Sequence, residues 1–349
     1  MTKEDEISRV HGNGSHVVIL GAGASIASTI KDPEKNGKVL PGMNNIIQIL
    51  EMDDIVAALP KELTDLSADF EKFYSKLVLR PEFVREQKLI ERKIYKYFSE
   101  LELPEKPTIY DYLILSLRPK DVIATFNWDP FLYQAYVRCG KFTQTPGILF
   151  LHGTVALGYD KIDKRTGPAG YYSKATMGRF EPTELLYPVE QKDYNSDEFI
   201  SGQWEMIAEE MRIAQRVTIF GYRAPESDVE AISLLQKGWG TPEQRAMEQF
   251  ELIDVRAEDE VKKSWNGFIH SHHYSYSTDF FDCSIARHPR RSVESYRHWS
   301  SPFTPDDVFQ DGNLVPNNFE TFEQMWEWYK PLVAAEEKFV KKVMAEKNK

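Results

Sequence analysis

Residues 16–25 read HVVILGAGAS, an apolar run that passes directly into a glycine-rich turn. A continuous apolar run containing β-branched residues is typical of a strand covered on both faces, as in a parallel sheet. The turn, with Gly21, Ala22, Gly23 and Ser25, predicts the start of a helix whose amides hold a pyrophosphate, because glycine lets the backbone approach phosphate closely. The simpler explanation is a tight strand-to-helix turn without a ligand.

The glycine-rich turn departs from the fingerprint of ordinary dinucleotide-binding dehydrogenases. Ile26 stands where the third glycine of that fingerprint is expected, and no second strand ends in an acidic residue about twenty positions further on. The sequence therefore disfavours an ordinary dehydrogenase.

Four further short runs, rich in apolar and β-branched residues, follow along the chain. Each leads into a polar or glycine-containing segment, and open α/β sheets bind ligands there, outside the carboxyl ends of their strands. We therefore predict an α/β fold: a Rossmann-like doubly wound parallel sheet with a helical insertion and a C-terminal helical segment. The four runs are Val122–Phe126, Ile148–Leu151, Val217–Phe220 and Phe250–Val255.

The chain between the first two strands predicts a helical insertion at 44–118. Apolar residues recur there at spacings of three and four, as on the buried face of a helix, and a third, short helix is expected at 110–117. The simplest role of these stripes is packing against the core. They comprise Leu63, Leu66, Phe70, Phe73 and Leu77, then Ile90, Ile94, Tyr97, Phe98 and Leu101.

The sequence outside this insertion is predicted to form two parts of the sheet domain and a C-terminal extension. Residues 1–43 hold the first strand, the glycine turn and a cofactor loop, and 119–255 complete the Rossmann-like domain, with a tyrosine-rich flap at about 160–195. Residues 256–349 are expected to form an extension that ends in a helix and serves as an oligomer or partner interface. The apolar face of that helix is predicted to hold Phe322, Met325, Trp326, Tyr329 and Leu332 or Val333.

Polar side chains gather where the second strand ends. Thr125, Asn127, Trp128 and Asp129 bring a hydroxyl, an amide, an aromatic ring and a carboxylate to the carboxyl edge of the sheet. Asp129 has a structural alternative as the N-cap of a helix whose first residue is Pro130, and capping is compatible with ligand contact.

A histidine follows the third strand at the same edge. His152, with an ordinary pKa of about 6.5, is the best candidate for a catalytic base, and Gly153 leaves room beside it for a substrate. The alternative is a core histidine with satisfied hydrogen bonds. The fourth and fifth strands end near Gly221, Arg223 and Asp254, and Asp254 either bonds ribose hydroxyls or is a solvated loop residue.

In this order, GAGAS, TFNWD, LHG, GYRAPESD and LID, between residues 19 and 255, resemble the sirtuin superfamily, and within it the bacterial branch of NAD-consuming immune effectors. The segment LPGM at 40–43 resembles the family segment that follows the first helix and folds over the cofactor. The ordered set is specific, whereas each motif alone is not.

The resemblance implies a role for each motif residue. Asn127 and Asp129 would face the nicotinamide half of NAD, and His152 would be the catalytic base. Arg223 stands where relatives often have serine or threonine near the phosphate. The residues expected to bind the cofactor are Gly21, Ala22, Gly23, Ser25, Pro41, Thr125, Trp128, Gly221, Arg223 and Asp254.

Cysteine usage separates this chain from the deacylating sirtuins. Cys139 and Cys283 are its only cysteines, so a four-cysteine zinc site is impossible and the zinc-binding ribbon is missing. The resemblance then implies hydrolysis of NAD to ADP-ribose and nicotinamide, with NAD as substrate and no metal. Two alternatives are ADP-ribosyl transfer at the same site and a non-catalytic sensor subunit that binds NAD or ADP-ribose.

Composition narrows the choice of partners. The net charge of −11 works against sequence-specific nucleic-acid binding, although a basic patch at Arg287–Arg291 is conceivable. No stretch approaches the roughly 20 apolar residues of a membrane span, and the charged N-terminus lacks a signal-peptide pattern, so we expect a cytoplasmic protein without membrane contact. The resemblance implies an antiphage effector that depletes NAD, forms a homo-oligomer, and has an ATPase or sensor protein from the same operon as partner.

Overall fold

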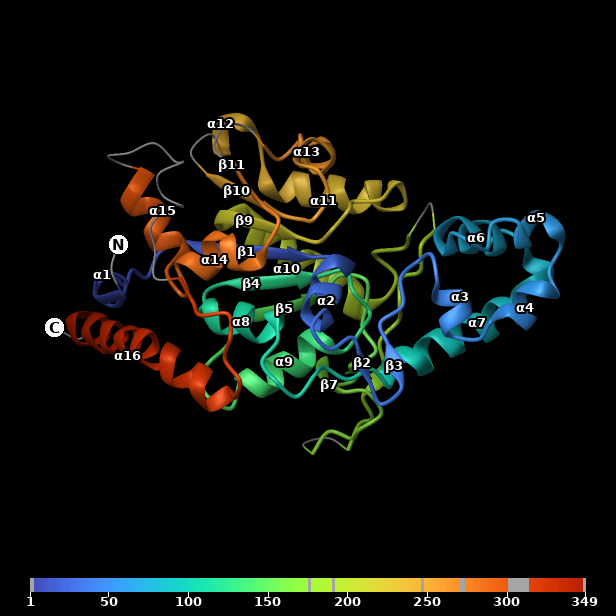
Figure 1. The fold of residues 1–349 in the computed structure, drawn as a ribbon, viewed down its shortest axis with the longest axis horizontal. Coiled ribbons are helices and arrows are strands. Elements are labelled where there is room, and N and C mark those ends of the chain that lie inside the picture. Colours follow the sequence, from blue (N-terminus) through green and yellow to red (C-terminus); the bar gives the residue numbers. More distant parts are fainter. Residues whose placement is uncertain are drawn as a thin grey trace.

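The computed structural model describes residues 3–174, 177–189, 192–245, 248–269, 274–300 and 314–347. Its centre is a six-stranded sheet with the order β11-β10-β9-β1-β4-β5, in which every neighbouring pair is parallel (Figure 1). The predicted α/β, doubly wound fold is therefore confirmed. Its strands are β1 (Ser15–Leu20), β4 (Val122–Thr125), β5 (Gly147–Phe150), β9 (Ala214–Phe220), β10 (Gln249–Ile253) and β11 (Tyr274–Ser277).

Strand β1 lies in the middle of the sheet, and all of its residues are buried. Val17 pairs with Val217 of β9 on one side and with Val122 of β4 on the other. Burial on both faces explains why residues 17–20 are continuously apolar, and the buried His16 is the polar exception. The other four predicted runs also form strands, with small shifts at their ends.

Strand β11 was not predicted. Its sequence, YSYS at Tyr274–Ser277, alternates aromatic and hydroxyl residues, and all four residues are only partly buried. The strand lies at the edge of the sheet beside β10, where one side is open to solvent. An edge strand does not need the apolar run by which the other five were recognised.

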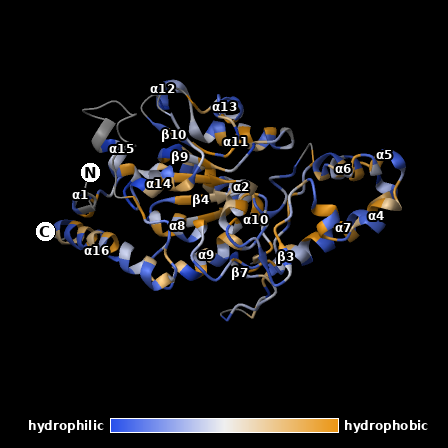
Figure 2. Cartoon of the chain, viewed as in Figure 1, coloured by the Kyte–Doolittle hydropathy of each residue, from blue (hydrophilic) through white to orange (hydrophobic). Residues whose placement is uncertain are grey.

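Helices cover both faces of this sheet, and Figure 2 shows hydrophobic colour on the central strands between them. Two hydrophobic cores result, one on each face. The first core is built with α8 (Ile109–Ser116), α9 (Phe131–Cys139) and α14 (Ser284–Arg287), and the second with α10 (Glu198–Ile213), α11 (Val229–Trp239) and α13 (Glu258–Trp265).

Five helices form a lobe at one end of the molecule (Figure 1). The first predicted stripe there is not a single helix, because the chain turns between Leu63 and Phe70, and the side chain of Asp69 caps a new helix by accepting the N–H of Lys72. The second stripe lies on one long helix from Ile90 to Phe98, and Leu101 follows the end of that helix. The lobe comprises α3 (Ile46–Ile49), α4 (Asp53–Ala57), α5 (Lys61–Thr64), α6 (Phe70–Leu77), the 3₁₀ turn η1 (Pro81–Phe83) and α7 (Val84–Ser99).

Short antiparallel strands flank the main sheet. The segment predicted as a flap carries a small sheet in the order β7-β6-β8, and a hairpin of β2 and β3 follows α2. Residues 175–176 and 190–191 of the predicted flap lie outside the described residues. The elements are α2 (Ala22–Thr29), β2 (Glu34–Lys35), β3 (Lys38–Val39), β6 (Leu157–Asp160), β7 (Arg165–Pro168) and β8 (Glu181–Pro182).

The C-terminal helix, α16 (Phe322–Lys347), lies at the end of the molecule opposite the lobe (Figure 1). Its predicted apolar face buries Met325, Tyr329 and Leu332. The remaining elements are α1 (Lys3–Ser8), η2 (Glu226–Asp228), α12 (Pro242–Arg245), η3 (Phe280–Asp282) and α15 (Ser292–Ser300).

The sequence also suggested a basic patch at Arg287–Arg291, and the structure corrects this. Arg290 and Arg291 are buried, and both form ion pairs with the buried Glu336 of α16, at 2.7 and 2.6 Å. These arginines bind the last helix to the core, and because they are buried and paired they cannot contact a phosphate backbone. Within the described ranges, no helix has the length and apolarity needed to cross a membrane.

Candidate functional site

The glycine turn after β1 packs against a second glycine turn after β9. The N–H of Gly23 donates to the carbonyl of Gly221 at 2.9 Å, and Gly221 has a φ of +62°. A Cβ on Gly21 would lie 2.5 Å from the Cα of Tyr222. The close contact of two turns thus explains these glycines without a ligand, while Ala22 is the exposed first residue of α2.

Four polar side chains meet at the start of α2. The hydroxyl of Ser25 donates to Asp129 Oδ2 at 2.7 Å and lies 2.7 Å from the hydroxyl of Tyr110. Asn127 Nδ2 donates to the same Ser25 oxygen at 2.9 Å. Because Ser25 gives its single proton to Asp129, Tyr110 must donate to Ser25. The Ser25 hydroxyl, which the resemblance placed against the cofactor, is fully buried and engaged within the protein.

Asn127 is fixed by this cluster through its amide nitrogen. Besides Ser25, Nδ2 donates to the carbonyl of Gly21 at 2.8 Å, and the backbone N–H of Asn127 donates to Thr125 Oγ1 at 3.0 Å. The orientation of the amide follows from these acceptors. The described residues offer no hydrogen bond to Oδ1 of this half-buried side chain, so the oxygen is free to accept one from a ligand.

Asp129 combines a capping role with an unusual acidity. Its Oδ1 accepts the N–H of Phe131 at 3.1 Å, and α9 begins at Phe131 with Pro130 as its N-cap, one residue later than predicted. Burial raises the pKa of Asp129 to about 6, against the lowering effect of the Ser25 and Phe131 hydrogen bonds. The carboxylate is therefore mostly ionised at neutral pH and costs energy to keep so.

His152 lies at the end of β5 with only 5% of its surface exposed. Its ring meets Phe126 edge to face at 4.7 Å, and Phe126 stacks on Tyr222 at 4.1 Å. In the part of the chain that the structure describes, Nε2 of His152 is buried without a hydrogen-bond partner, and Oδ1 of Asp228 lies 3.9 Å from it. Most buried polar groups are hydrogen-bonded, so an unpartnered imidazole nitrogen points to a functional site.

The charge state of His152 follows from its surroundings. Burial lowers its pKa to about 4, with Asp228 acting to raise it and Lys192 to lower it. The imidazole is therefore neutral at pH 7 and able to accept a proton.

A chain segment covers His152 in this structure. The N–H of Leu186 donates to the carbonyl of His152 at 3.0 Å. Gly153 has a φ of +76°, and a Cβ on it would lie 1.8 Å from the carbonyl oxygen of Glu184. The room that Gly153 was predicted to leave for a substrate is thus filled by the backbone of Glu184.

Asn127 and His152 follow neighbouring strands and belong to separate groups of contacts. Tyr110, which bonds the first group, belongs to one hydrophobic core, whereas Phe126 and Tyr222 of the second group belong to the other. No hydrogen bond or ion pair between described residues joins the amide to the imidazole. A single cleft that holds both side chains stays a prediction.

Four other residues were predicted to bind the cofactor. Trp128 is buried, with the ring of Phe98 from the lobe at 5.9 Å, and its Nε1 has no hydrogen-bond partner among the described residues. Arg223 is exposed and pairs with Glu71 of α6 at 3.7 Å. Two further positions are Pro41, in the loop between β3 and α3, and Asp254, whose carboxylate pairs with Arg256 at 2.7 Å.

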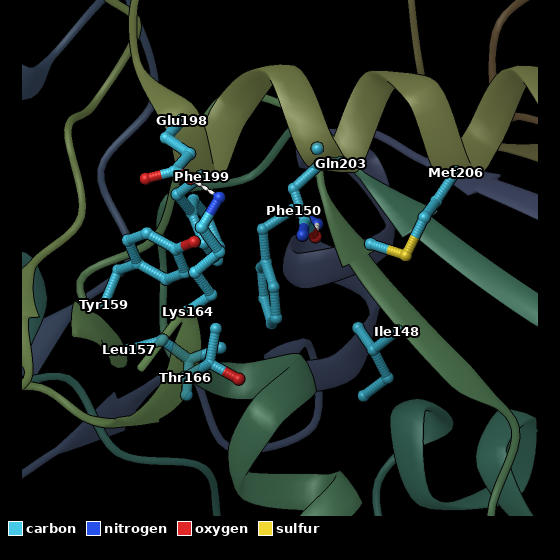
Figure 3. A pocket seen from close by; sticks show the side chains of 11 residues that line it. Ile148, Phe150, Leu157, Tyr159, Lys164, Thr166, Glu198, Phe199, Gln203 and Met206 are labelled. Carbon is cyan, nitrogen blue, oxygen red and sulfur yellow. Dashed lines mark hydrogen bonds and ion pairs between the residues drawn. The ribbon is translucent and has the colours of Figure 1, made fainter. Parts of the chain in front are cut away.

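A cavity of about 370 Å³ lies elsewhere, between β5, the β6–β7 hairpin and α10 (Figure 3). Its floor includes Phe150 and Phe199, and Lys164 and Glu198 form an ion pair of 2.7 Å beside it. None of the predicted site residues lines this cavity.

Sequence reasoning missed Tyr110, Lys192, Tyr222 and Asp228. Tyr222 and Asp228 stand inside the motif GYRAPESD, so the signal was present, but the motif did not indicate which members face His152. Tyr110 and Lys192 lie in segments that gave no chemical signal. Within the described residues, no three His, Cys, Asp or Glu side chains gather in a way that could hold a metal ion.

No family model matches the chain, and no curated protein sequence does. The solved structures that resemble it include Sir2 enzymes. One, from a study of the mechanism and regulation of Sir2 enzymes, is 12% identical with a TM-score of 0.40, over 84% of this chain and 96% of that one. A Sir2 homolog in complex with NAD is 12% identical with a TM-score of 0.36, over 85% of this chain and 93% of that one. At these TM-scores the likeness carries no weight for function, which must follow from this chain's own residues.

Proposed function

We propose that the protein is an NAD hydrolase that cleaves the bond between nicotinamide and ribose and releases ADP-ribose and nicotinamide. The observation that carries this proposal is that Nε2 of His152 is buried and has no hydrogen-bond partner among the described residues. His152 follows β5, and Asn127, whose Oδ1 accepts no hydrogen bond from the described residues, follows the neighbouring strand β4. Both residues belong to motifs that resemble the sirtuin superfamily, and the missing zinc ribbon argues against deacylation.

The chemistry suits these side chains. Nicotinamide leaves as the ribose gains oxocarbenium character, so the site must stabilise positive charge and activate a nucleophile. The Asp129 carboxylate supplies a negative field, and Asn127 Oδ1 would accept a hydrogen bond from water or a ribose hydroxyl. His152, neutral at pH 7, would take the proton of the attacking water.

Ionisation of these groups sets the expected pH dependence. The pKa of Asp129 is about 6 and that of His152 about 4. Both groups must be unprotonated to act, so NAD cleavage should fall as the pH drops through about 6, the higher of the two values.

Substrate entry requires a change of conformation. Glu184 and Leu186 contact the backbone of Gly153 and His152, and we expect their segment to move when a dinucleotide reaches the imidazole. We expect this movement to bring the clusters of Asn127 and His152 around one substrate. Movement of a covering segment is a common step in enzymes that exclude water from their site.

The proposal is tested by incubating the purified chain with NAD labelled in the ADP-ribose half and measuring nicotinamide release by chromatography. Release with free labelled ADP-ribose is the expected result. Label on protein would indicate ADP-ribosyl transfer, and binding without release would indicate a sensor subunit. No release and no binding, also at high protein concentration, would refute a role for NAD.

Asn127→Ala is the test variant, because Asn127 holds the free amide oxygen. The matched control is Asn13→Ala, which removes an exposed asparagine amide before β1, at the other end of that strand from Gly21. We expect Asn127→Ala to lose nicotinamide release and Asn13→Ala to keep it.

The biological setting rests on the motif resemblance alone. We infer that NAD depletion serves antiphage defence, and that a homo-oligomer or a partner such as an ATPase or sensor protein restrains the activity. Light scattering across a range of protein concentrations tests the oligomer, and a monomer at every concentration would contradict it.

A further inference from the structure

Asp228 faces the unpartnered nitrogen of His152 from the turn η2, which precedes α11. The carboxylate is itself buried, and its Oδ1 lies 3.9 Å from Nε2 of His152, which is close but too far for a hydrogen bond. A carboxylate that accepts one imidazole N–H is the usual way of fixing the tautomer of a catalytic histidine. The carboxylate and the imidazole thus lie close together without forming a hydrogen bond in this structure.

Two other donors hold Asp228 in place. The hydroxyl of Tyr222 donates to Oδ2 at 2.6 Å, and the ammonium of Lys192 donates to Oδ1 at 2.6 Å. Lys192 therefore occupies the oxygen that faces the imidazole. Its side chain is only 2% exposed, and it also donates to the carbonyl of Ser227 at 2.7 Å.

Lys192 belongs to the chain between β8 and α10 that also contains Glu184 and Leu186. Glu184 and Leu186 contact the backbone of Gly153 and His152, and we expect the movement that admits a dinucleotide to extend to Lys192 and to withdraw its ammonium from Asp228. Removing one partner of a buried ion pair leaves the other charge buried and uncompensated, which costs free energy. The Asp228 carboxylate therefore needs a new partner once Lys192 leaves.

We propose that Asp228 is a positioning residue for His152 and that Lys192 competes with the imidazole for its Oδ1. Once Lys192 withdraws, Nε2–H of His152 donates to Asp228, and Nδ1 is left as the nitrogen that accepts a proton. This inference rests on the proposed function for its biological meaning, but the competition itself is a property of the free protein.

The charges around His152 act in opposite directions. Burial lowers the pKa of His152 most, Asp228 raises it and Lys192 lowers it. Among the described residues, the ring of Tyr194 stacks on this histidine at 6.1 Å and Tyr222 donates to Asp228, and burial raises the pKa of both phenols, so they stay neutral. The pKa of Asp228 is lowered although burial acts to raise it, because His152 and Lys192 outweigh that effect.

The alternative is that Asp228 merely neutralises Lys192 and has no connection with the imidazole. The two explanations differ in what happens to His152 when the lysine charge is removed. If Asp228 is only a counter-ion, its charge still raises the pKa of His152, but the neutral tautomer of His152 is the same whether position 228 then holds a carboxylate or an amide.

The test is a titration of His152 by NMR on protein with ¹⁵N-labelled histidine rings, assigned by the loss of signal in His152→Gln. We expect Lys192→Met to raise the pKa of His152 by about one to two units and to place the neutral proton on Nε2. In the charge-matched variant Lys192→Met/Asp228→Asn, the pKa should fall again and the preference for Nε2–H should be lost. The same neutral tautomer in these two variants would overturn the proposal, whatever their pKa values.

Lys192→Met removes one of the hydrogen-bond donors to the buried Asp228 carboxylate and could fail to fold. A second variant is therefore needed. Lys192→Gln keeps a hydrogen-bond donor for Asp228 without the charge, and we expect it also to raise the pKa of His152. A pKa that stays at the wild-type value in Lys192→Gln contradicts the proposal.

Turnover provides an independent readout. NAD cleavage by Lys192→Met/Asp228→Asn should be at least about tenfold slower than by Lys192→Met, because the imidazole loses its orienting acceptor. If no variant and no wild-type protein cleaves NAD, the proposed function fails while the titration still decides whether Asp228 and Lys192 compete. If cleavage occurs but both variants titrate alike, only the present inference fails.

Discussion

His16 and His152 are both buried histidines with a lowered pKa, yet their surroundings differ in one decisive respect. His16, in β1, is fully buried, with Nδ1 2.8 Å from Ser292 Oγ and Nε2 2.7 Å from Thr218 Oγ1. His152, at the end of β5, has a buried Nε2 without a partner among the described residues. The first imidazole is satisfied by the fold, and the second is not.

The donor and the acceptor of each hydrogen bond around His16 can be assigned. Thr218 donates its proton to Glu251 Oε2 at 2.9 Å, so it must accept from Nε2–H of His16, and Ser292 then donates to Nδ1. Ser284 also donates to Glu251, at 2.8 Å. This network fastens the C-terminal chain to the sheet, and nothing in it is available to a ligand.

Burial and a lowered pKa therefore do not by themselves identify a catalytic histidine. Desolvation lowers the pKa of both rings. What distinguishes them is position at the carboxyl edge of the sheet together with a nitrogen that the protein leaves unbonded.

The largest expected effect is on turnover. His152→Gln should lower NAD cleavage by about 1,000-fold, the usual range for loss of a general base, and should change the free energy of unfolding by less than about 1 kcal/mol. His16→Ala should leave the rate per folded molecule unchanged. Nicotinamide release and urea denaturation of both variants measure this, and equal rates in the two variants would break the distinction.

The next effect is on stability, with the roles reversed. His16→Ala leaves the buried hydroxyls of Thr218 and Ser292 short of a partner, at about 1 to 3 kcal/mol each. We expect the free energy of unfolding to fall by about 3 kcal/mol. A loss of under about 1 kcal/mol would show that the network is not a support of the fold.

Asp129→Asn should raise stability and lower activity. The folded protein holds the Asp129 proton more tightly than the unfolded chain, with a pKa of about 6 against 3.8, so its ionisation destabilises the fold as the pH rises through this window. At pH 7 the amide should add about 3 kcal/mol to the free energy of unfolding, and NAD cleavage should fall by about 100-fold. In urea denaturation at pH 4 the gain should nearly vanish; a gain equal at both pH values would contradict the assigned cause.

The smallest expected effect is on the stability of the fold at acidic pH. The pKa of His152 in the folded protein, about 4, lies below its ordinary value of 6.5, so its contribution to stability is complete above 6.5 and is lost as the pH falls toward 4. Between pH 7 and pH 5.5, wild type should lose about 1 kcal/mol more than His152→Gln. Parallel stability curves for the two proteins would mean that His152 is not held neutral by the fold.

Most of the sheet could be predicted because burial on both faces leaves an apolar signature. The runs at 16–20, 122–126 and 217–220 show it, and their ends located the turns at Gly21 and Gly221. Strand β11 and the break at Asp69 could not be predicted in this way, since an edge strand and a capped turn carry weak local patterns.

The candidate site was predictable only as a set of strand ends. The motifs indicated Asn127, Asp129 and His152, but contacts between distant segments decide what each one does. Tyr110 and Lys192 became visible as partners only in three dimensions, and the same holds for the carbonyl of Glu184 that fills the space beside Gly153.

The most direct test asks whether the clusters of Asn127 and His152 act on one substrate. It measures kcat/KM for nicotinamide release in wild type, Asn127→Ala, His152→Gln and the double variant. Residues that act as a unit in one transition state give strongly non-additive losses. We predict a double variant no slower than the slower single variant; losses that multiply in full, or a single variant at the wild-type rate, would show that the two clusters do not form one site.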